Sequence, residues 1–521
     1  MDSAFSAVLE AVRAHEAAAG RAGDIEVRQT HASVVFLTRS EVFKLKKPVD
    51  FGFLDYSTPR RRALMCRREV AVNRRLAPDV YLGVLRLTDA GGGKLEIDGR
   101  GPIVDHLVHM RRLPDDASLA SLVTRDLATA DQLTAIARRL AAFHADAPAA
   151  PARYGGPAAV RRIVAENFRA LQPLAGATPL SPTIDVLRSY ARSFLAGHAT
   201  LFRQRVHEGR IRQCHGDLRA EHVYLAPRLE IIDAIEFNRS LQCIDVANDI
   251  AFLAMDLAAL GAPDLSRMLV DEYRDASRDD FGGLLDFYAA YRALVRAKVA
   301  TLRSVEEEIS PPERDAARLE AVRFAHRAWR YAVDERRPAL LVMVGLTGTG
   351  KSTLARSLGE VLSAPIVNAD ETRKRLAGKA PFERSHDPPD TGLYAPEMNA
   401  KVYAAMIGQA RTHLERGRDV VLDATFRRQS DRSSAATLAA TTGAELVFVE
   451  CIAAPGLVRQ RLEARALAGD PWSDGRWEIY LAQQQSFEFL APAERSHAIS
   501  VDASLPPLEQ VHRVVARLER R

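Results

Sequence analysis

The sequence predicts two different folds in one chain: an α+β region made of two lobes, followed by an α/β region with a parallel five-stranded sheet. Three observations support this prediction. Short strand-like runs dominate residues 25–113, whereas helical periodicity dominates residues 119–335. Five apolar runs alternate with helical stretches after residue 337. The chain has 521 residues, which is too long for one hydrophobic core. We therefore expect roughly two to four domains.

The second half carries the clearest alternation of strands and helices. A charged segment, DERRP, follows the helical pattern of residues 311–333 and precedes the first strand, so we place a domain boundary there. Helical stretches separate the later strands, as in a doubly wound parallel sheet. We expect one α/β domain over residues 337–521. Its predicted strands are residues 339–344, 365–369, 419–423, 445–451 and 498–502.

A phosphate-binding loop follows the first of these strands. Residues 345–352 read GLTGTGKS, which is the complete P-loop pattern, between an apolar strand and a helical stretch. Glycines let backbone N–H groups curl around a phosphate, the lysine reaches the β- and γ-phosphates, and the serine hydroxyl takes a Mg²⁺ position. We therefore expect ATP to bind here, with Ser352 as a metal ligand. The expected nucleotide-binding residues are Gly345, Leu346, Thr347, Gly348, Thr349, Gly350, Lys351, Ser352 and Thr353.

Five further residues of this half lie where a kinase would use them. Asp370 and Arg373 follow the second strand, and the strand ends of such a sheet lie beside the nucleotide. We predict that Asp370 activates an acceptor hydroxyl and that Arg373 holds the substrate. Asp423 ends the third strand, where a Walker B carboxylate reaches Mg²⁺. Arg461 and Arg465, one helical turn apart, are predicted to close over the transferred phosphoryl group. The alternative is a capping aspartate with solvated arginines.

The first half contains a second set of residues suited to phosphoryl transfer. Asp217 lies in a loop that reads HGD, and Asp233 follows it in an apolar strand. Transfer to a hydroxyl needs a carboxylate near that hydroxyl and oxygen ligands that hold Mg²⁺. Lys44 lies on a strand and Glu69 on the helix that follows, so an ammonium held by a glutamate completes the set. Each residue alone has a structural explanation, but the ordered set predicts a nucleotide site.

On these residues, the segment from 25 to about 305 resembles the aminoglycoside phosphotransferase family, a relative of choline kinases and eukaryotic-type protein kinases. The resemblance implies a protein-kinase-like bilobal domain over residues 1–335, with a small lobe at about 25–113 and a large lobe at about 119–335. Asp245 and Asp249 would then brace the catalytic loop. The resemblance implies these roles: Asp217 is the catalytic base, Asp233 a Mg²⁺ ligand, Lys44 the phosphate lysine, Glu69 its partner, and Met110 an adenine-hinge residue.

One position departs from that family's pattern, and two further features leave the phosphate contacts open. The catalytic loop of the family ends in a metal-binding asparagine, and His222 stands at that position. Imidazole is a poor Mg²⁺ ligand compared with an oxygen donor, so His222 as a metal ligand puts catalysis by this domain in doubt. Lys46 shares a strand face with Lys44, so either lysine can be the phosphate lysine. No glycine-rich loop precedes Lys44.

Residues 337–521 resemble the small P-loop kinases, in particular the polynucleotide kinase-like and zeta-toxin-like group of AAA-family ATP-binding proteins. Gluconate kinase is a more distant relative. The Asp-x-x-Arg spacing of Asp370 and Arg373 and the later segment SDGRWEIY carry this resemblance. It implies an α/β P-loop NTPase domain that binds ATP and Mg²⁺. The resemblance does not fix the phosphate acceptor.

Composition limits the setting in which the chain works. The net charge of +5 and the pI near 9.0 come from dispersed residues rather than basic blocks, so we do not expect a nucleic-acid partner. The four cysteines show no metal spacing and are expected to be buried thiols in a reducing compartment. No apolar run reaches the roughly 18 residues of a membrane span, and we expect a cytoplasmic protein.

The sequence therefore predicts a two-domain ATP-binding phosphotransferase that moves the γ-phosphoryl group of ATP to a hydroxyl of a small molecule or nucleotide. One alternative is a pseudokinase-like first domain that controls an active P-loop kinase, which His222 favours. Another is a nucleic-acid end kinase. The oligomeric state and the identity of either acceptor are not predicted.

Overall fold

The computed structural model describes residues 3–52, 54–171, 181–306, 309–333, 337–379, 392–468 and 476–519. The contacts within the chain form two compact units. The first comprises Met1–Arg162, Leu195–Leu260 and Leu265–Tyr288, and the second comprises Ile163–Phe194, Gly261–Asp264 and Ala289–Arg521. The domain boundary expected near residue 336 lies within the second unit, and it stays a prediction about where the two functional modules meet.

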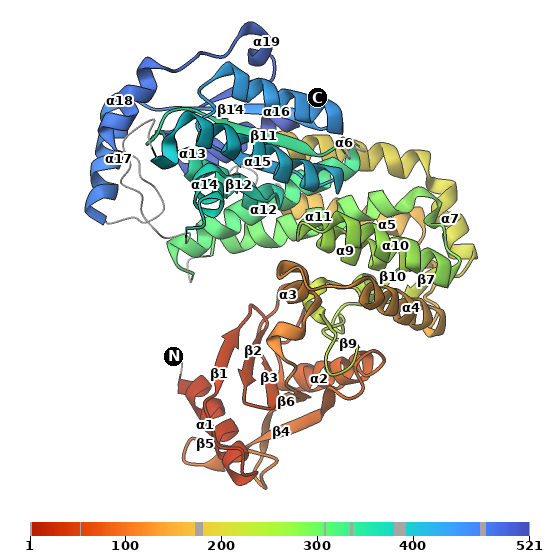
Figure 1. Ribbon diagram of the computed structural model, residues 1–521. Helices are drawn as coiled ribbons and strands as arrows, with labels where there is room; N and C mark the ends of the chain where they lie inside the picture. Colours follow the sequence, from red (N-terminus) through yellow and green to blue (C-terminus); the bar gives the residue numbers. More distant parts are fainter. Residues whose placement is uncertain are drawn as a thin grey trace. The chain divides into compact units, whose positions relative to one another are not determined.

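The first unit begins with a six-stranded antiparallel sheet in the order β1-β2-β3-β6-β4-β5 (Figure 1). The strand-like runs of the sequence at residues 33–38, 41–47, 81–88, 94–98 and 104–110 all form strands of this sheet, and β1 is one more. The elements are α1 (Ser3–Ala18), β1 (Glu26–Gln29), β2 (Ser33–Leu37), β3 (Glu41–Lys46), α2 (Pro59–Asn73), β4 (Tyr81–Gly91), β5 (Lys94–Ile97) and β6 (Ile103–Arg111).

The two faces of this sheet are covered by different helices. Phe43 packs in a cluster with residues of α1, whereas Val42 packs in a cluster with residues of α2. Side chains alternate between the faces of a strand, so Lys44 and Lys46 lie on the same face as Val42 and point toward α2. α2 begins after Thr58, whose side chain accepts a hydrogen bond from the backbone N–H of Arg61. β3 thus presents two lysines to α2.

The remainder of the first half is mostly helical, as predicted. All 14 residues of α9 are buried. Two short antiparallel pairs, β7 with β10 and β8 with β9, flank the HGD segment. The helices are α3 (Leu119–Thr124), α4 (Ala130–Asp146), α5 (Pro157–Leu171), α6 (Ser181–Gly197), α7 (Ala199–His207), α8 (Arg239–Gln242), α9 (Val246–Ala259), α10 (Pro263–Ser277), α11 (Leu284–Ser304) and α12 (Pro311–Ala332). The strands are β7 (Ile211–Gln213), β8 (Val223–Tyr224), β9 (Glu230–Ile231) and β10 (Cys243–Asp245).

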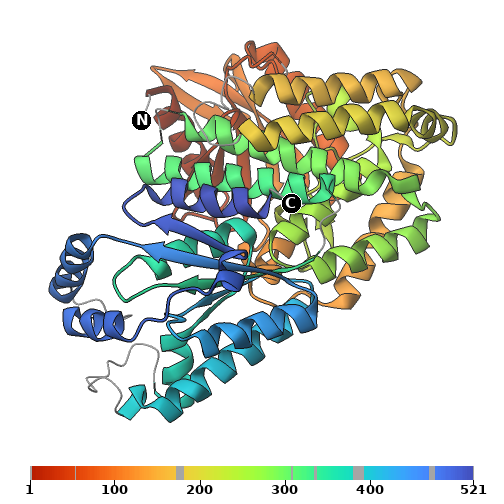
Figure 2. The same cartoon turned by 90° about the horizontal axis from the view of Figure 1, so that it is seen from above.

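The second unit is built on a parallel five-stranded sheet in the order β12-β13-β11-β14-β15. Helices lie on both faces of this sheet (Figures 1 and 2). All five predicted strands are present, and the predicted fold class is confirmed. The strands are β11 (Ala339–Val344), β12 (Ile366–Asn368), β13 (Val420–Asp423), β14 (Glu445–Ile452) and β15 (Ala498–Asp502). The helices are α13 (Lys351–Leu362), α14 (Ala369–Leu376), α15 (Pro396–Glu415), α16 (Gln429–Thr442), α17 (Pro455–Ala468), α18 (Trp477–Gln485), α19 (Pro492–Arg495) and α20 (Pro507–Leu518).

The position of β11 determines where a ligand can bind in this sheet. Every residue of β11 is buried, and Leu340, Val342 and Val344 share a core cluster with residues of α15 and α16. β11 pairs with β13 on one side and with β14 on the other. The strand order therefore reverses at β11, and the carboxyl end of such a strand is where open α/β sheets bind ligands.

Two further features concern the chain as a whole. Across the described ranges, none of the helices has the combination of length and apolar character that crossing a membrane requires. All four cysteines (Cys66, Cys214, Cys243 and Cys451) are buried and carry reduced thiols.

Candidate active sites

Side chains of α9 hold the loop that carries Asp217 in position. The Asp249 carboxylate accepts hydrogen bonds from the backbone N–H groups of His215 and Gly216, each at 2.9 Å. Two helical turns later, Asp256 accepts from the N–H of Ala220 at 2.9 Å. A buried carboxylate that accepts several backbone N–H groups holds their segment rigidly. Asp249 therefore braces the loop, as expected.

Asp245, the other residue expected to brace the loop, does something different. Its side chain accepts from the N–H of Ala247 and so caps the start of α9. It also pairs with Arg205, at 2.6 Å, and Arg205 pairs in turn with Asp279. Asp245 thus anchors α9 rather than the loop itself.

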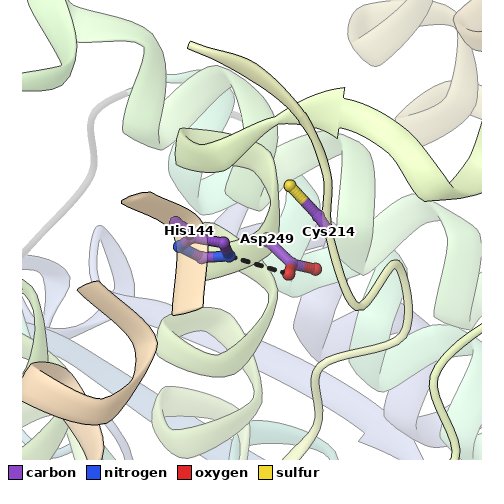
Figure 3. A group of neighbouring side chains, drawn as sticks. All are labelled: His144, Cys214 and Asp249. Carbon is purple, nitrogen blue, oxygen red and sulfur yellow. Dashed lines mark hydrogen bonds and ion pairs between the residues drawn. The ribbon is translucent and has the colours of Figure 1, made fainter. Parts of the chain in front are cut away.

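A histidine supports Asp249 from the other side. His144, on α4, lies 3.1 Å from Asp249 through Nε2 and 2.8 Å from the Tyr273 hydroxyl through Nδ1. Figure 3 shows the imidazole pointing toward the carboxylate, with Cys214 beside them. The three side chains offer potential metal-ligand atoms within 4.8 Å of one another. Since Asp249 also accepts the two loop N–H groups, we interpret this cluster as support for the loop.

Lys44 connects the two lobes of the first domain, because its ammonium bonds to Glu69 of the small lobe and to Asp233 of the large lobe. Its Nζ lies 2.9 Å from Glu69 Oε1 and 2.8 Å from Asp233 Oδ1. Burial alone would lower the pKa of the Lys44 ammonium, but Asp233 and Glu69 outweigh burial and raise it well above its ordinary value. Lys44 in turn holds the pKa of Asp233 well below its ordinary value. Three of the predicted residues thus form one charged group.

Asp233 has a backbone conformation that is rare for a residue other than glycine. Its φ is +65°, in the left-handed region, which costs on the order of 1 kcal/mol. Two contacts stabilise it: the Tyr81 hydroxyl accepts the Asp233 N–H at 3.0 Å, and Asn73 Oδ1 accepts the Ala234 N–H at 2.7 Å. Sequence reasoning missed Tyr81 and Asn73, because no local pattern connects them with Asp233.

Asp217 lies among groups that keep it ionised. Burial favours its neutral form, but the Arg219 guanidinium beside it holds the pKa of Asp217 below its ordinary value. The Arg219 side chain donates to Asp217 Oδ2 at 3.1 Å. A carboxylate with a low pKa is better suited to orienting a hydroxyl than to storing its proton.

His222 is hydrogen-bonded through both of its ring nitrogens. Nδ1 lies 2.8 Å from the backbone oxygen of Asp217, so it donates, and Nε2 then accepts from Arg219 at 3.0 Å. Asp233 Oδ2 is 3.8 Å from Nε2. A bond from His222 to a metal would therefore require Arg219 to leave Nε2, and the role of His222 as a metal ligand stays a prediction.

Met110 lies near the end of β6, opposite Val42 of β3, and is 8% exposed. It belongs to the cluster beneath α2, which also contains Tyr81. Its predicted place at an adenine hinge is neither supported nor contradicted by these contacts. The turn between β1 and β2 contains Thr30, His31 and Ala32 and no glycine, in agreement with the sequence.

The P-loop connects β11 to α13 through residues that only glycine fits. Gly345, Gly348 and Gly350 have φ values of +142°, +77° and +90°. A Cβ on Gly348 would lie 2.8 Å from a methyl group of Val458. Lys351 is the first residue of α13, is 7% exposed, and donates through Nζ to the backbone oxygen of Leu346 at 2.6 Å. The loop thus directs backbone N–H groups and one lysine to the helix N-terminus, which favours a phosphate.

Oxygen donors lie at the end of the neighbouring strand. Asp423 ends β13, is 5% exposed, and accepts from the side-chain amide of Asn368 at 2.8 Å. Ser352, in the first turn of α13, is exposed. Asn368 also caps α14, since its side chain accepts from the N–H groups of Asp370 and Glu371.

Asp370 and Arg373 are paired with each other. Arg373 donates to Asp370 Oδ1 and, at 3.1 Å, to Asn399 Oδ1 on α15. Its guanidinium also lies 4.7 Å from the ring centroid of Tyr394. Arg373 is 7% exposed, so it is not the solvated arginine of the alternative reading. No local sequence pattern connects Asn399 or Tyr394 with Arg373.

Arg461 lies against the P-loop. One of its terminal nitrogens donates to the backbone oxygen of Ala503 at 2.8 Å, and the other, Nη1, is buried with no hydrogen-bond partner among the described residues. A Cβ on Gly350 would lie 3.2 Å from Nη1. The side chain of Arg465 lies outside what the structure describes. Roles for Arg461 and Arg465 in closing over a phosphoryl group therefore stay predictions.

A P-loop at the reversal point of a five-stranded parallel sheet defines a P-loop NTPase domain within the second unit. The antiparallel sheet, the Lys44–Glu69 pair and the braced Asp217 loop define a protein-kinase-like bilobal domain in the first half. Residues 340–490 match a family model described as an AAA domain.

Relatives match along most of the chain. It is 36% identical over 446 residues to the uncharacterized protein Rv2004c of Mycobacterium tuberculosis H37Rv, covering 85% of this chain and 86% of that protein. The uncharacterized protein Mb2027c of Mycobacterium bovis matches to the same extent. The chain therefore belongs to the same family as these mycobacterial proteins.

Solved structures match parts of the chain. A protein from Ralstonia eutropha JMP134, described as a candidate aminoglycoside phosphotransferase, covers 63% of this chain and 98% of its own, with 16% identity and a TM-score of 0.37. The APS kinase of Mycobacterium tuberculosis, solved with AMPPNP and APS, covers 35% and 98%, with 20% identity and a TM-score of 0.26. A gluconokinase from Sinorhizobium meliloti 1021 covers 35% and 95%, with 19% identity and a TM-score of 0.26.

Proposed function

We propose that the chain is a two-domain ATP-dependent phosphotransferase, in which each domain moves the γ-phosphoryl group of ATP to a hydroxyl of a small molecule or nucleotide. The observation that carries the proposal is the left-handed glycine loop that ends at Lys351, at the N-terminus of α13. The domains are residues 1–335 and 337–521.

In the second domain, the P-loop would hold the phosphates through backbone N–H groups and Lys351. Asp370, 39% exposed and fixed by Arg373, would orient the acceptor hydroxyl. Arg461 would provide positive charge for the transferred group, since its Nη1 faces the loop without a hydrogen-bond partner among the described residues. Arg373 would hold the acceptor together with Asn399.

In the first domain, Lys44 would hold phosphates and Glu69 would keep Lys44 in position. Asp217, ionised and fixed by its loop, would orient the acceptor hydroxyl. Met110 would lie at the adenine. The contacts of Lys44 with Asp233 and Glu69 support its role as the phosphate lysine over Lys46.

The donor atoms at both sites fit Mg²⁺, which prefers oxygen ligands. In the second domain these are the exposed Ser352 hydroxyl and the Asp423 carboxylate. In the first domain the carboxylate is that of Asp233, whose pKa is held low, so it is ionised at neutral pH. Mg²⁺ would neutralise charge on the transferred phosphoryl group.

One observation favours a second candidate function, a non-catalytic first domain that regulates the P-loop domain. His222 occupies the place of the metal-binding asparagine, and both of its nitrogens are hydrogen-bonded. His222→Asn separates the two functions. A gain in phosphate turnover from the first domain would indicate a decayed metal site and a regulatory role, whereas unchanged turnover would indicate that His222 is compatible with catalysis.

A screen for ATP-dependent phosphorylation of metabolites, nucleotides and antibiotics tests the main proposal. It should use the intact chain, Lys351→Ala and Asp217→Ala. Loss of one product with Lys351→Ala and of another with Asp217→Ala would support two active domains. The proposal is wrong for the second domain if Lys351→Ala leaves ATP affinity and every activity unchanged.

A further inference from the structure

The segment that follows β9 is held at several points by elements of the small lobe. Asp233 bonds to Lys44 and to the Tyr81 hydroxyl, and Ala234 bonds to Asn73. Glu236, the next charged residue, also bonds to the small lobe. These ties come from β3, β4 and α2, so residues 233–236 connect the lobes of this domain.

Lys46 makes the tie at Glu236, with a geometry that leaves it no free donor. Its Nζ lies 2.6 Å from Glu236 Oε1, 2.6 Å from Glu69 Oε2 and 3.1 Å from the Tyr56 hydroxyl. A lysine ammonium has three N–H donors, and these contacts use all three. The Lys46 side chain is only 1% exposed. Lys46 therefore has neither the access nor the donor needed to bind a phosphate.

Lys44 differs from Lys46 in its exposure and in the number of its hydrogen bonds. Its side chain is 19% exposed, and its Nζ contacts two carboxylates, those of Glu69 and Asp233. Glu69 is shared: Oε1 accepts from Lys44 and Oε2 from Lys46. A phosphate that takes Lys44 away from Asp233 would leave the second ammonium on Glu69 undisturbed.

We propose that Lys46, Tyr56 and Glu236 form a strap that keeps Glu69 and residues 233–236 in position, and that Lys44–Asp233 is the tie that nucleotide replaces. The three strap residues are positioning residues and do not touch the substrate. This inference rests on the proposed function for its second part only, since the strap itself is a property of the chain without nucleotide.

The Tyr56 hydroxyl completes the strap. It lies 2.6 Å from Glu236 Oε1, so this carboxylate oxygen receives a hydrogen bond from tyrosine and from lysine at once. Tyr56 is 2% exposed, and its ring lies 4.6 Å from the Lys46 ammonium. Removing one member of such a buried group takes a hydrogen-bond partner from each of the others, so we expect residues 233–236 to open more often.

Hydrogen exchange of the full-length chain, followed by mass spectrometry, tests the strap without nucleotide. The informative amides are those of Asp233 and Ala234, whose N–H groups bond to the small lobe. Lys46→Met and Glu236→Gln should each raise their exchange rate about tenfold or more, and Tyr56→Phe should raise it less. Lys94→Met, at an exposed lysine of β5, is the matched control and should change nothing. Exchange at these amides in Lys46→Met equal to that in Lys94→Met would overturn the strap.

Titration with ATP and MgCl₂ tests the second part in the same experiment. In Lys46→Met, Glu69 loses its second ammonium, so we expect the ATP concentration that half-protects residues 41–46 to rise about tenfold. In Tyr56→Phe, which keeps Lys46, this concentration should rise less. Lys44→Met should remove this protection while leaving Asp233 and Ala234 slow to exchange without nucleotide. If Lys46→Met is too unstable to purify, Tyr56→Phe and Glu236→Gln carry the test.

The two parts fail in different ways. Absence of any ATP-dependent protection at residues 41–46 in the unmodified chain would contradict the proposed function of the first domain, while the exchange rates without nucleotide would still decide the strap. An ATP requirement that is unchanged in Lys46→Met, despite faster exchange at Asp233, would show that Lys46 stabilises the fold and does not position Glu69.

Discussion

The two candidate nucleotide sites differ in the contacts described for their lysines. Lys44 lies between two carboxylates of its own chain, whereas Lys351 donates to the neutral backbone oxygen of Leu346. A triphosphate at the first site must separate the Lys44–Asp233 ion pair, whereas at the second site backbone N–H groups of the glycine loop also face the phosphates. Burial of unpaired charge is costly, so the first site needs a cation to replace Lys44 at Asp233. The first site should therefore depend on Mg²⁺ for binding, and the second mainly for chemistry.

The largest expected effect separates the two lysines. Lys351→Ala should lower phosphotransfer by the second domain about 10³-fold, because the lysine provides charge where the transition state develops it. Lys44→Ala should leave that activity unchanged. Lys401→Ala, at an exposed lysine of α15, is the control. Steady-state rates with a product assigned to the second domain measure the effect, and an equal loss in both lysine variants would contradict two independent sites.

Removal of Mg²⁺ sharpens the same comparison. With EDTA, ATP affinity should fall about 100-fold at the first site, where Lys44 would leave Asp233 unpaired. At the second site it should fall about tenfold or less, because backbone N–H groups and Lys351 remain. Equilibrium dialysis of ATP with Lys351→Ala reports on the first site, and with Lys44→Ala on the second. A larger fall in ATP affinity at the second site than at the first would contradict our interpretation of the two sites.

A smaller effect concerns the support of the Asp217 loop. Asp249→Asn keeps the shape of the side chain but replaces one oxygen acceptor with a donor, beside the N–H groups of His215 and Gly216. Loss of one such buried bond should lower the free energy of unfolding of the first unit by about 1–3 kcal/mol. Denaturant unfolding measures it. Asp271→Asn, at a side chain that is 71% exposed, should change stability by less than about 0.5 kcal/mol.

The smallest expected effect is a dependence on pH. Burial lowers the pKa of His215 below its ordinary value of 6.5, and its Nε2 donates to the Ile232 oxygen at 2.9 Å. The folded chain then binds this proton less readily than the unfolded chain, so stability falls as pH drops below about 6.5 and is level above it. Thermal unfolding between pH 5 and 8 checks the sign. His215→Asn should reduce the loss of stability below pH 6.5. His207→Asn, at an exposed histidine, should leave that loss unchanged.

The sequence predicted the parts of each site that have a local signal. The P-loop strand and helix follow from an apolar run and a glycine pattern, and the predicted β3 and α2 carry Lys44 and Glu69 because their periodicities are regular. β1 was missed because EVRQ has no apolar alternation: three of its four residues are exposed. Roles for Tyr81, Asn73 and Glu236 could not be predicted, because their contacts join segments far apart in the chain.

The lysine alternatives illustrate the same limit. Spacing alone places Lys44 and Lys46 on one strand face, and it cannot rank them. Their ranking depends on Tyr56 and Glu236, which surround one lysine and not the other. Grouping of residues 289–333 with the parallel sheet is likewise a result of tertiary packing, which helical periodicity does not encode.

The four buried thiols have a practical consequence. Burial raises the pKa of Cys66, beneath the antiparallel sheet, and of Cys451, beside the P-loop, to about 12. Alkylating reagents attack the thiolate, so these sulfurs react only when their surroundings open. Cys66 lies in one unit and Cys451 in the other. The alkylation rates of these two cysteines therefore measure how often the surroundings of each open, without any added label.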